Sequence, residues 1–197
     1  MVRSPLALLL LLVSTGASAQ ERPTRADLQR ALAQHERSVV KVRGARESGP
    51  GIIVGTEGQV LTAVHNVNLE AARVVYDGQT LPARVVLANA SLKVAVIAAP
   101  ASTYPAVPVQ VTPGSPVGQW FIGVVPARGK QPATPVSAQA HPAPAPFFDV
   151  DLMLPAGSPL FDVHGRLVAV VVQRQGSGCR ALPMEAVKQQ LAARDSP

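Results

Sequence analysis

The spacing of apolar positions near the amino terminus predicts a helix. Leu28, Ala31 and Leu32 recur at intervals that place them on one face of a helix. Thr24 precedes them, and threonine commonly caps helix amino termini because its hydroxyl accepts a backbone N–H bond. The pattern therefore predicts a short helix within residues 20–37.

From residue 38 onward the pattern becomes extended. Short runs of branched apolar residues alternate with turn signals such as Asp77-Gly78, a strong hairpin dipeptide. A proline-rich segment at 101–116 separates two sets of such runs. The expected strands are 38–43, 51–54, 60–64, 73–76, 79–87 and 93–98 in the first set, and 119–125, 135–140, 147–152 and 167–173 in the second. Many short strands with turns between them are typical of a small β-barrel or sandwich.

A second helix is expected at the carboxyl end. Met184, Val187 and Leu191 share one face of the segment 184–193. The extended region would thus be flanked by one short helix on each side.

The first 19 residues have the pattern of a signal peptide. A short basic start is followed by the apolar run Leu6–Val13 and the small-residue site Ala17-Ser18-Ala19. The apolar run is too short for a permanent transmembrane helix, although an uncleaved amino-terminal anchor is the alternative. We therefore expect an exported protein, periplasmic or extracellular, that begins at Gln20 and has no permanent membrane anchor.

Charge and composition narrow the function classes. The formal net charge is +6, but basic residues form no continuous run, and aromatic residues make up 4% of the chain. A solvated basic face fits this pattern better than a nucleic-acid site, so we expect no nucleic-acid partner. The weaker alternative is binding to an anionic surface.

Cysteine and histidine usage points away from disulfide and metal chemistry. Cys179 is the only cysteine, so an internal disulfide is impossible; it is expected either to be buried or to pair with another chain. The four histidines are scattered, without the spacing of a metal site. We expect neither a metal nor another cofactor.

Five strings occur in a fixed order along the chain. They are GPGIIV at 49–54, LTAVHNV at 61–67, KVAVI at 93–97, PLFD with GRLVAV between 159 and 170, and GCRALP at 178–183. In this order they resemble strings of trypsin-like serine proteases, especially the HtrA-type branch, and LTAVHNV is similar to the segment around that family's catalytic histidine. The resemblance covers roughly residues 38–191.

This resemblance implies an all-β chymotrypsin-like fold of two six-stranded antiparallel barrels. The first barrel would span about 38–100 and the second about 117–183, joined by the linker and followed by the carboxyl-terminal helix. The family's active site lies between the barrels. No PDZ-like domain is expected after the final helix.

The resemblance also assigns candidate catalytic positions. His65 matches the general base, Lys93 stands at the position of the acid, and Ala156 stands at the position of the nucleophile. Ser158, two residues later, is the alternative nucleophile. Leu154-Pro155 replaces the Gly-Asn of the family's oxyanion turn.

These residue types do not fit triad chemistry. Lys93 has only donors, so it cannot accept the imidazole N–H bond, and the methyl group of Ala156 cannot attack a carbonyl. Proline lacks the N–H that an oxyanion turn uses. His65 is therefore either a base or a residue without proton-transfer work, and Lys93 lies either beside His65 or in solvent.

Two functions follow from this pattern. The first is a proteolytically inactive domain that binds a peptide or partner protein, with an extended segment docking beside Val171, Val172 and Gln173. The alternative for that strand is full pairing inside the second barrel. The second function is a serine endopeptidase that uses His65 and Ser158. The sequence predicts no oligomeric state.

Overall fold

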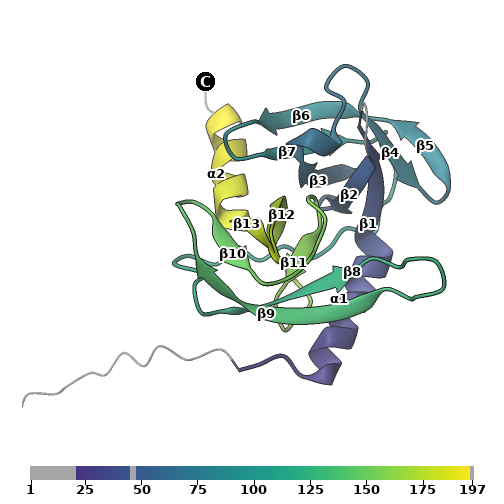
Figure 1. Cartoon of the computed structure of the whole chain (residues 1–197). Helices are drawn as coiled ribbons and strands as arrows, with labels where there is room; N and C mark the ends of the chain where they lie inside the picture. The colour runs from purple at the N-terminus through teal and green to yellow at the C-terminus, as the bar shows by residue number, and fades with distance from the viewer. Residues whose placement is uncertain (1–20, 45–47, 196–197) are drawn as a thin grey trace, which may run out of the picture.

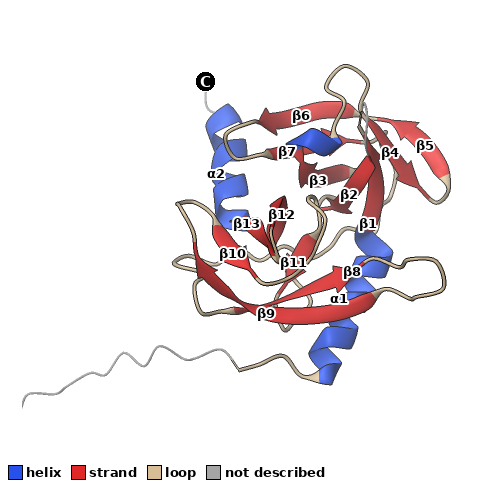
Figure 2. Ribbon diagram, viewed as in Figure 1, coloured by secondary structure: helices blue, strands red, loops and turns tan. Residues whose placement is uncertain are grey.

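Two β units follow one another along the chain, with a helix at each end (Figures 1 and 2). The computed structural model describes residues 21–44 and 48–195. The predicted signal peptide at 1–19 lies outside the described residues. The arrangement confirms the predicted all-β class and both short helices.

The first unit is a curled sheet of seven strands rather than the expected closed six-stranded barrel. The predicted strand 79–87 divides at Ala83: residues 79–82 pair with 73–76, a pairing that the bond from the Ala83 N–H to the Ala72 carbonyl at 2.8 Å extends, whereas residues 84–89 pair with 94–98. Pro82, which has no N–H, ends the first of the two resulting strands. The strands are β1 (Val39–Arg43), β2 (Ser48–Ile53), β3 (Gln59–Ala63), β4 (Arg73–Tyr76), β5 (Gln79–Pro82), β6 (Arg84–Asn89) and β7 (Val94–Ala98).

The strand order of this sheet is β5-β4-β1-β2-β3-β7-β6. Its two edge strands, β5 and β6, are consecutive in the chain and are separated by Ala83 alone. The chain itself therefore joins the two edges of the curled sheet, without a hydrogen-bonded ladder between them.

The second unit is a closed barrel of six strands, in the order β10-β13-β12-β11-β8-β9. Two of these strands were missed by the hydrophobic pattern: β11 has only three residues, and β13 carries Gly178 and Arg180 within a short apolar run. The strands are β8 (Trp120–Val125), β9 (Thr134–Pro142), β10 (Phe148–Val150), β11 (Pro159–Phe161), β12 (Leu167–Gln175) and β13 (Gly178–Pro183).

Strands at the centre of the molecule are buried on both faces. On β2, Ile53 packs inside the first unit, whereas the adjacent Ile52 packs in a separate cluster between the two units. Val60 and Leu61 on β3 divide in the same way. This explains why their sequences are continuous apolar runs instead of alternating ones. Each such fully buried side chain contributes about 1.5–3 kcal/mol to folding.

The cluster between the units also fixes both helices. α1 (Arg25–Ser38) contributes the fully buried Ala31, and α2 (Met184–Asp195) contributes Val187. Gln190 of α2 accepts a 2.8 Å bond from the side-chain amide of Asn89 in the first unit. The helices thus lie against both β units.

The predicted amino-terminal cap is present. The Thr24 hydroxyl accepts a bond from the Asp27 N–H at 3.3 Å, and the Asp27 carboxylate accepts one from the Thr24 N–H at 2.9 Å. The Thr24 hydroxyl also donates to the Asp27 carboxylate at 2.7 Å, and this bond, together with that from the Thr24 N–H, lowers the pKa of Asp27. The reciprocal pair satisfies two of the free donors at the start of α1. No helix in the described part of the chain is long and apolar enough to cross a membrane.

The proline-rich segment 101–116 is bonded to both units. The N–H of Val107 donates to the Ile53 carbonyl at 2.9 Å, and the N–H of Leu167 donates to the Pro108 carbonyl at 2.8 Å. The linker therefore helps to fix how the two units meet.

Candidate functional site

His65 lies on a single 3-10 turn, η1 (Val64–Asn66), directly after β3. Its side chain is exposed. The backbone N–H of Val64 donates to the Lys93 carbonyl at 3.0 Å, so the turn carrying His65 lies beside the residue that precedes β7. The structure therefore brings the predicted base position and the predicted acid position together.

Lys93 has two unusual features. Its φ of 56° lies in the left-handed region, which non-glycine residues rarely adopt. Its ammonium donates a hydrogen bond to the side-chain oxygen of Gln173 on β12. Lys93 is half-buried and reaches across to the second unit rather than extending into solvent.

The loop 154–158, where the resemblance places the nucleophile, is held by backbone and side-chain bonds. The Ala156 carbonyl accepts a bond from the Asn66 side-chain amide at 2.8 Å. Gly157 has a φ of +94° and donates its N–H to the Val171 carbonyl at 2.6 Å. The Ser158 carbonyl accepts from the Val171 N–H at 2.8 Å. The loop is therefore attached both to the turn of His65 and to β12.

Asn66 is a site residue that the sequence reasoning missed. It is buried, and its amide nitrogen also lies 3.0 Å from the Thr62 hydroxyl oxygen and 3.3 Å from the Pro50 carbonyl oxygen. The only sequence signal was its place next to His65. Its partner Ala156 is 90 positions away, so the contact depends on the tertiary fold.

Ser158, the alternative nucleophile, is 2% exposed. It directly precedes β11, and its own N–H donates to the Pro155 carbonyl at 3.2 Å. Ser158 is therefore part of the turn that leads into a buried strand, whereas His65 is exposed.

The turn that would bind an oxyanion is closed by internal bonds. The Leu154 N–H donates to the Leu152 carbonyl at 3.0 Å, and the Leu154 side chain is fully buried in the second barrel. Pro155, which follows, has no N–H. A preorganised pair of backbone donors is the usual source of oxyanion stabilisation in acyl transfer.

The segment Val171–Gln173 differs from the expected free edge. Both backbone groups of Val171 are bonded to the loop 154–158, which corrects the prediction that a peptide pairs with this residue. Val171 and Val172 are also buried side chains. The residues that pair with Val171, Gly157 and Ser158, lie just before β11 and outside its three residues. Pairing by such a turn segment is not indicated by any strand pattern in the sequence. Gln173 is half-buried and holds Lys93.

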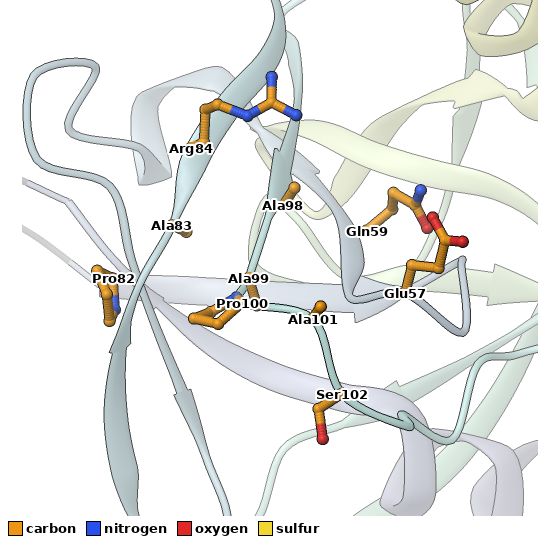
Figure 3. A pocket seen from close by; sticks show the side chains of 10 residues that line it. All are labelled: Glu57, Gln59, Pro82, Ala83, Arg84, Ala98, Ala99, Pro100, Ala101 and Ser102. Atoms are coloured by element: carbon orange, nitrogen blue, oxygen red, sulfur yellow. The ribbon is translucent and has the colours of Figure 1, made fainter.

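A hollow of about 820 Å³ lies away from these residues, on the first unit (Figure 3). It is lined mainly by small residues at the ends of β5, β6 and β7, with the charged side chains of Glu57 and Arg84 at its rim. None of the sequence-predicted site residues lines it.

Two titratable groups outside the site are shifted by burial. Cys179 is buried as one of the two sequence alternatives predicted, and burial raises the pKa of its thiol to about 12. Burial also lowers the pKa of His35 on α1 to about 4. Among the described residues, no group of three or more His, Cys, Asp or Glu side chains could hold a metal ion.

Known proteins share both sequence features and the fold of this chain. The model of the trypsin-like peptidase domain matches residues 49–170. No curated protein matches the chain. Solved structures do match: the serine endoprotease from Yersinia pestis aligns with a TM-score of 0.72 and 20% identity over 89% of this chain and 69% of that one.

The Rv3671c protease from Mycobacterium tuberculosis, in its inactive form, aligns with a TM-score of 0.67 and 22% identity over 90% of this chain and 99% of that chain. A serine-to-alanine mutant of the same protein, also in its inactive form, aligns equally well over 98% of its length. At these identities the structural likeness establishes the fold.

Proposed function

This chain belongs to the trypsin-like peptidase domain family, and we propose that it is an exported member that binds a peptide or partner protein without cleaving it. The family fold places its functional groups where the two β units meet. What differs here is the chemistry of the residues at that place.

The observation that carries the proposal is the closed loop 154–158. The resemblance puts Ala156 at the nucleophile position, and a methyl group has no lone pair with which to attack. Two residues earlier, at the position of one of the family's two oxyanion donors, the Leu154 N–H is already bonded to the Leu152 carbonyl. The nucleophile and one oxyanion donor are thus both affected at one loop, which supports loss of catalysis.

The acid position supports the same conclusion. A catalytic carboxylate would fix the tautomer of the histidine and stabilise the imidazolium. Lys93 offers only N–H donors, and it uses one of them on Gln173. Among the residues that the structure describes, no carboxylate forms an ion pair with His65 within 4.0 Å.

The alternative is a serine endopeptidase that uses His65 and Ser158. It requires the Ser158 hydroxyl to reach both His65 and a substrate, but Ser158 is 2% exposed in the turn before β11. A fluorophosphonate probe and casein hydrolysis separate the two functions. We expect neither labelling nor cleavage by the purified domain; labelling that disappears in Ser158→Ala would establish the endopeptidase instead.

The binding half of the proposal concerns the same junction, formed by η1, Lys93, the loop 154–158 and Gln173. Since Val171 is already paired, a docking segment would contact Gln173 and the exposed His65 instead. The mature domain should be used to capture partners, and amide hydrogen exchange should then be measured with and without the captured partner. Protection confined to surfaces outside the junction would contradict this location.

Export is the remaining part of the proposal, and it rests on the pattern of residues 1–19. Cleavage after Ala19 should leave a mature chain that begins at Gln20. Amino-terminal sequencing of the protein from the periplasmic or secreted fraction tests this directly. An intact Met1 in a membrane extract would indicate an uncleaved anchor.

A further inference from the structure

Lys93 is held in a backbone conformation that its side chain does not favour. Its φ of 56° is one of two positive values at non-glycine residues in the described chain, and Lys93, like Asp77, belongs to a hairpin turn: it ends the segment 90–93 that joins β6 to β7. A left-handed conformation costs a lysine roughly 1–2 kcal/mol. The closure of this hairpin, in which Asn89 pairs with Val94, imposes the conformation.

The turn between β6 and β7 brings Lys93 to the junction. The Lys93 carbonyl accepts the N–H of Val64, next to His65, while its own N–H donates to the Ala90 carbonyl at 3.3 Å. The side chain then reaches β12 of the other unit. The strained backbone thus directs a cation to the place where the two β units meet.

The partner of this cation is a neutral group. The ammonium is half-buried and bonds to the amide oxygen of Gln173, and no described carboxylate forms an ion pair with it. A partly desolvated charge is more stable beside an opposite charge than beside an amide dipole. A carboxylate arriving at the junction would therefore replace the amide of Gln173 as the stronger acceptor.

We propose that Lys93 binds a carboxylate of the peptide or partner segment that docks at the junction, and that Gln173 occupies this position until the ligand arrives. The inference rests on the proposed function and adds the chemistry of the ligand: an acidic segment. The formal net charge is +6 for the whole chain and, without Arg3, 6 − 1 = +5 for the chain that begins at Gln20, and it favours the approach of such a ligand. The carboxylate has two sources, an acidic side chain or a free carboxyl terminus.

Three fluorescein-labelled hexapeptides distinguish these sources. The first is Gly-Val-Thr-Val-Glu-Val with an amidated carboxyl terminus, the second replaces Glu by Gln, and the third is the Gln peptide with a free carboxyl terminus. Fluorescence anisotropy with the mature domain gives the dissociation constants. We expect the Glu peptide or the free-acid peptide to bind about tenfold more tightly than the neutral peptide.

Two variants test the role of Lys93. Lys93→Gln should bind all three peptides alike, and Lys93→Arg should keep the preference for the carboxylate. Lys188→Gln removes an exposed charge from α2 and is the matched control. It should keep the tenfold preference. Thermal denaturation of each variant establishes that it is folded before its binding is compared.

Each outcome is decisive. Equal binding of the charged and neutral peptides to the wild type overturns the role of Lys93 but leaves peptide binding at the junction intact. A loss of preference in Lys188→Gln as large as in Lys93→Gln also overturns it, because net charge alone would then explain the effect. If none of the three peptides binds, the carboxylate site is rejected, and partner capture with hydrogen exchange decides separately whether the junction binds a protein.

Discussion

The side-chain amide of Asn66 donates a hydrogen bond to the carbonyl oxygen of Ala156 at 2.8 Å. This bond joins the 3-10 turn that carries His65 to the loop 154–158 of the other β unit. The two candidate catalytic positions are therefore fixed relative to one another by a residue that has no catalytic chemistry of its own.

Asn66→Asp should be strongly destabilising at neutral pH. The amide donates toward three oxygen acceptors, and a carboxylate there would face the Ala156 and Pro50 carbonyl oxygens without a donor. We expect the free energy of unfolding at pH 7 to fall by about 3 kcal/mol.

The pH dependence of this variant has a definite sign. Burial among carbonyl oxygens would raise the pKa of the new carboxyl above its unfolded value of about 3.9, so stability is retained at low pH and lost as the pH rises. Asn68→Asp is the control, because Asn68 uses only its side-chain oxygen, which accepts from the N–H groups of Glu70 and Ala71. Urea denaturation at pH 4 and pH 7 measures both variants. A similar loss in both would contradict the role of the Asn66 donor.

Gly157→Ala should disrupt the loop 154–158. A Cβ at this position would lie 2.1 Å from the Pro50 carbonyl oxygen and 2.6 Å from the Asn66 amide nitrogen, at a φ of +94°. Backbone strain costs of the order of 1–3 kcal/mol, and overpacking adds about 1–3 kcal/mol.

Gly114→Ala separates these two contributions. Gly114 has a φ of +100°, but a Cβ added there would meet no atom within 4 Å, so only the strain remains. Chemical denaturation should show a larger loss of unfolding free energy for Gly157→Ala than for Gly114→Ala. Equal losses would show that the close approach to Pro50 relaxes at little cost.

Contacts between residues that are close in the sequence were predictable, whereas contacts made only by the tertiary fold were not. The cap formed by Thr24 and Asp27 was predictable because its partners are three residues apart. The division of 79–87 at Ala83 was not, because it depends on the two halves of this segment pairing with different strands, β4 and β7.

The candidate site divides in the same way. Ordered family-like strings placed His65 and Lys93, and the structure brings their backbones together through Val64. The bond from Lys93 to Gln173 and the bond from Asn66 to Ala156 link residues 80 and 90 positions apart. No periodic pattern carries that information, so the contacts that define the junction came only from the fold.

Acid should weaken the fold through His35. Burial lowers the pKa of His35 to about 4 in the folded state, below the unfolded value of about 6.5. The unfolded chain therefore takes up a proton first, and stability falls as the pH drops from about 6.5 to about 4. Between pH 7 and pH 4.5 this should cost on the order of 2 kcal/mol.

His35→Gln should reduce this acid sensitivity, whereas His164→Gln should leave it unchanged because His164 is exposed in the turn before β12. Urea denaturation midpoints at several pH values measure the difference. The assignment fails if wild type and His35→Gln lose stability in parallel over this range.

Restoring a hydroxyl at the nucleophile position should not restore proteolysis. Ala156→Ser would supply the missing oxygen, but Lys93 still cannot accept the N–H of His65, and the Leu154 N–H remains bonded to the Leu152 carbonyl. Groups that act as a unit in catalysis give little activity when only one is returned. We expect no casein cleavage from Ala156→Ser and none from Ala156→Ser combined with Lys93→Asp, because the oxyanion turn is unchanged in both. Rapid fluorophosphonate labelling of either variant, absent from the wild type, would show that the loop 154–158 opens to stabilise an oxyanion and that the loss of chemistry lies in the triad alone.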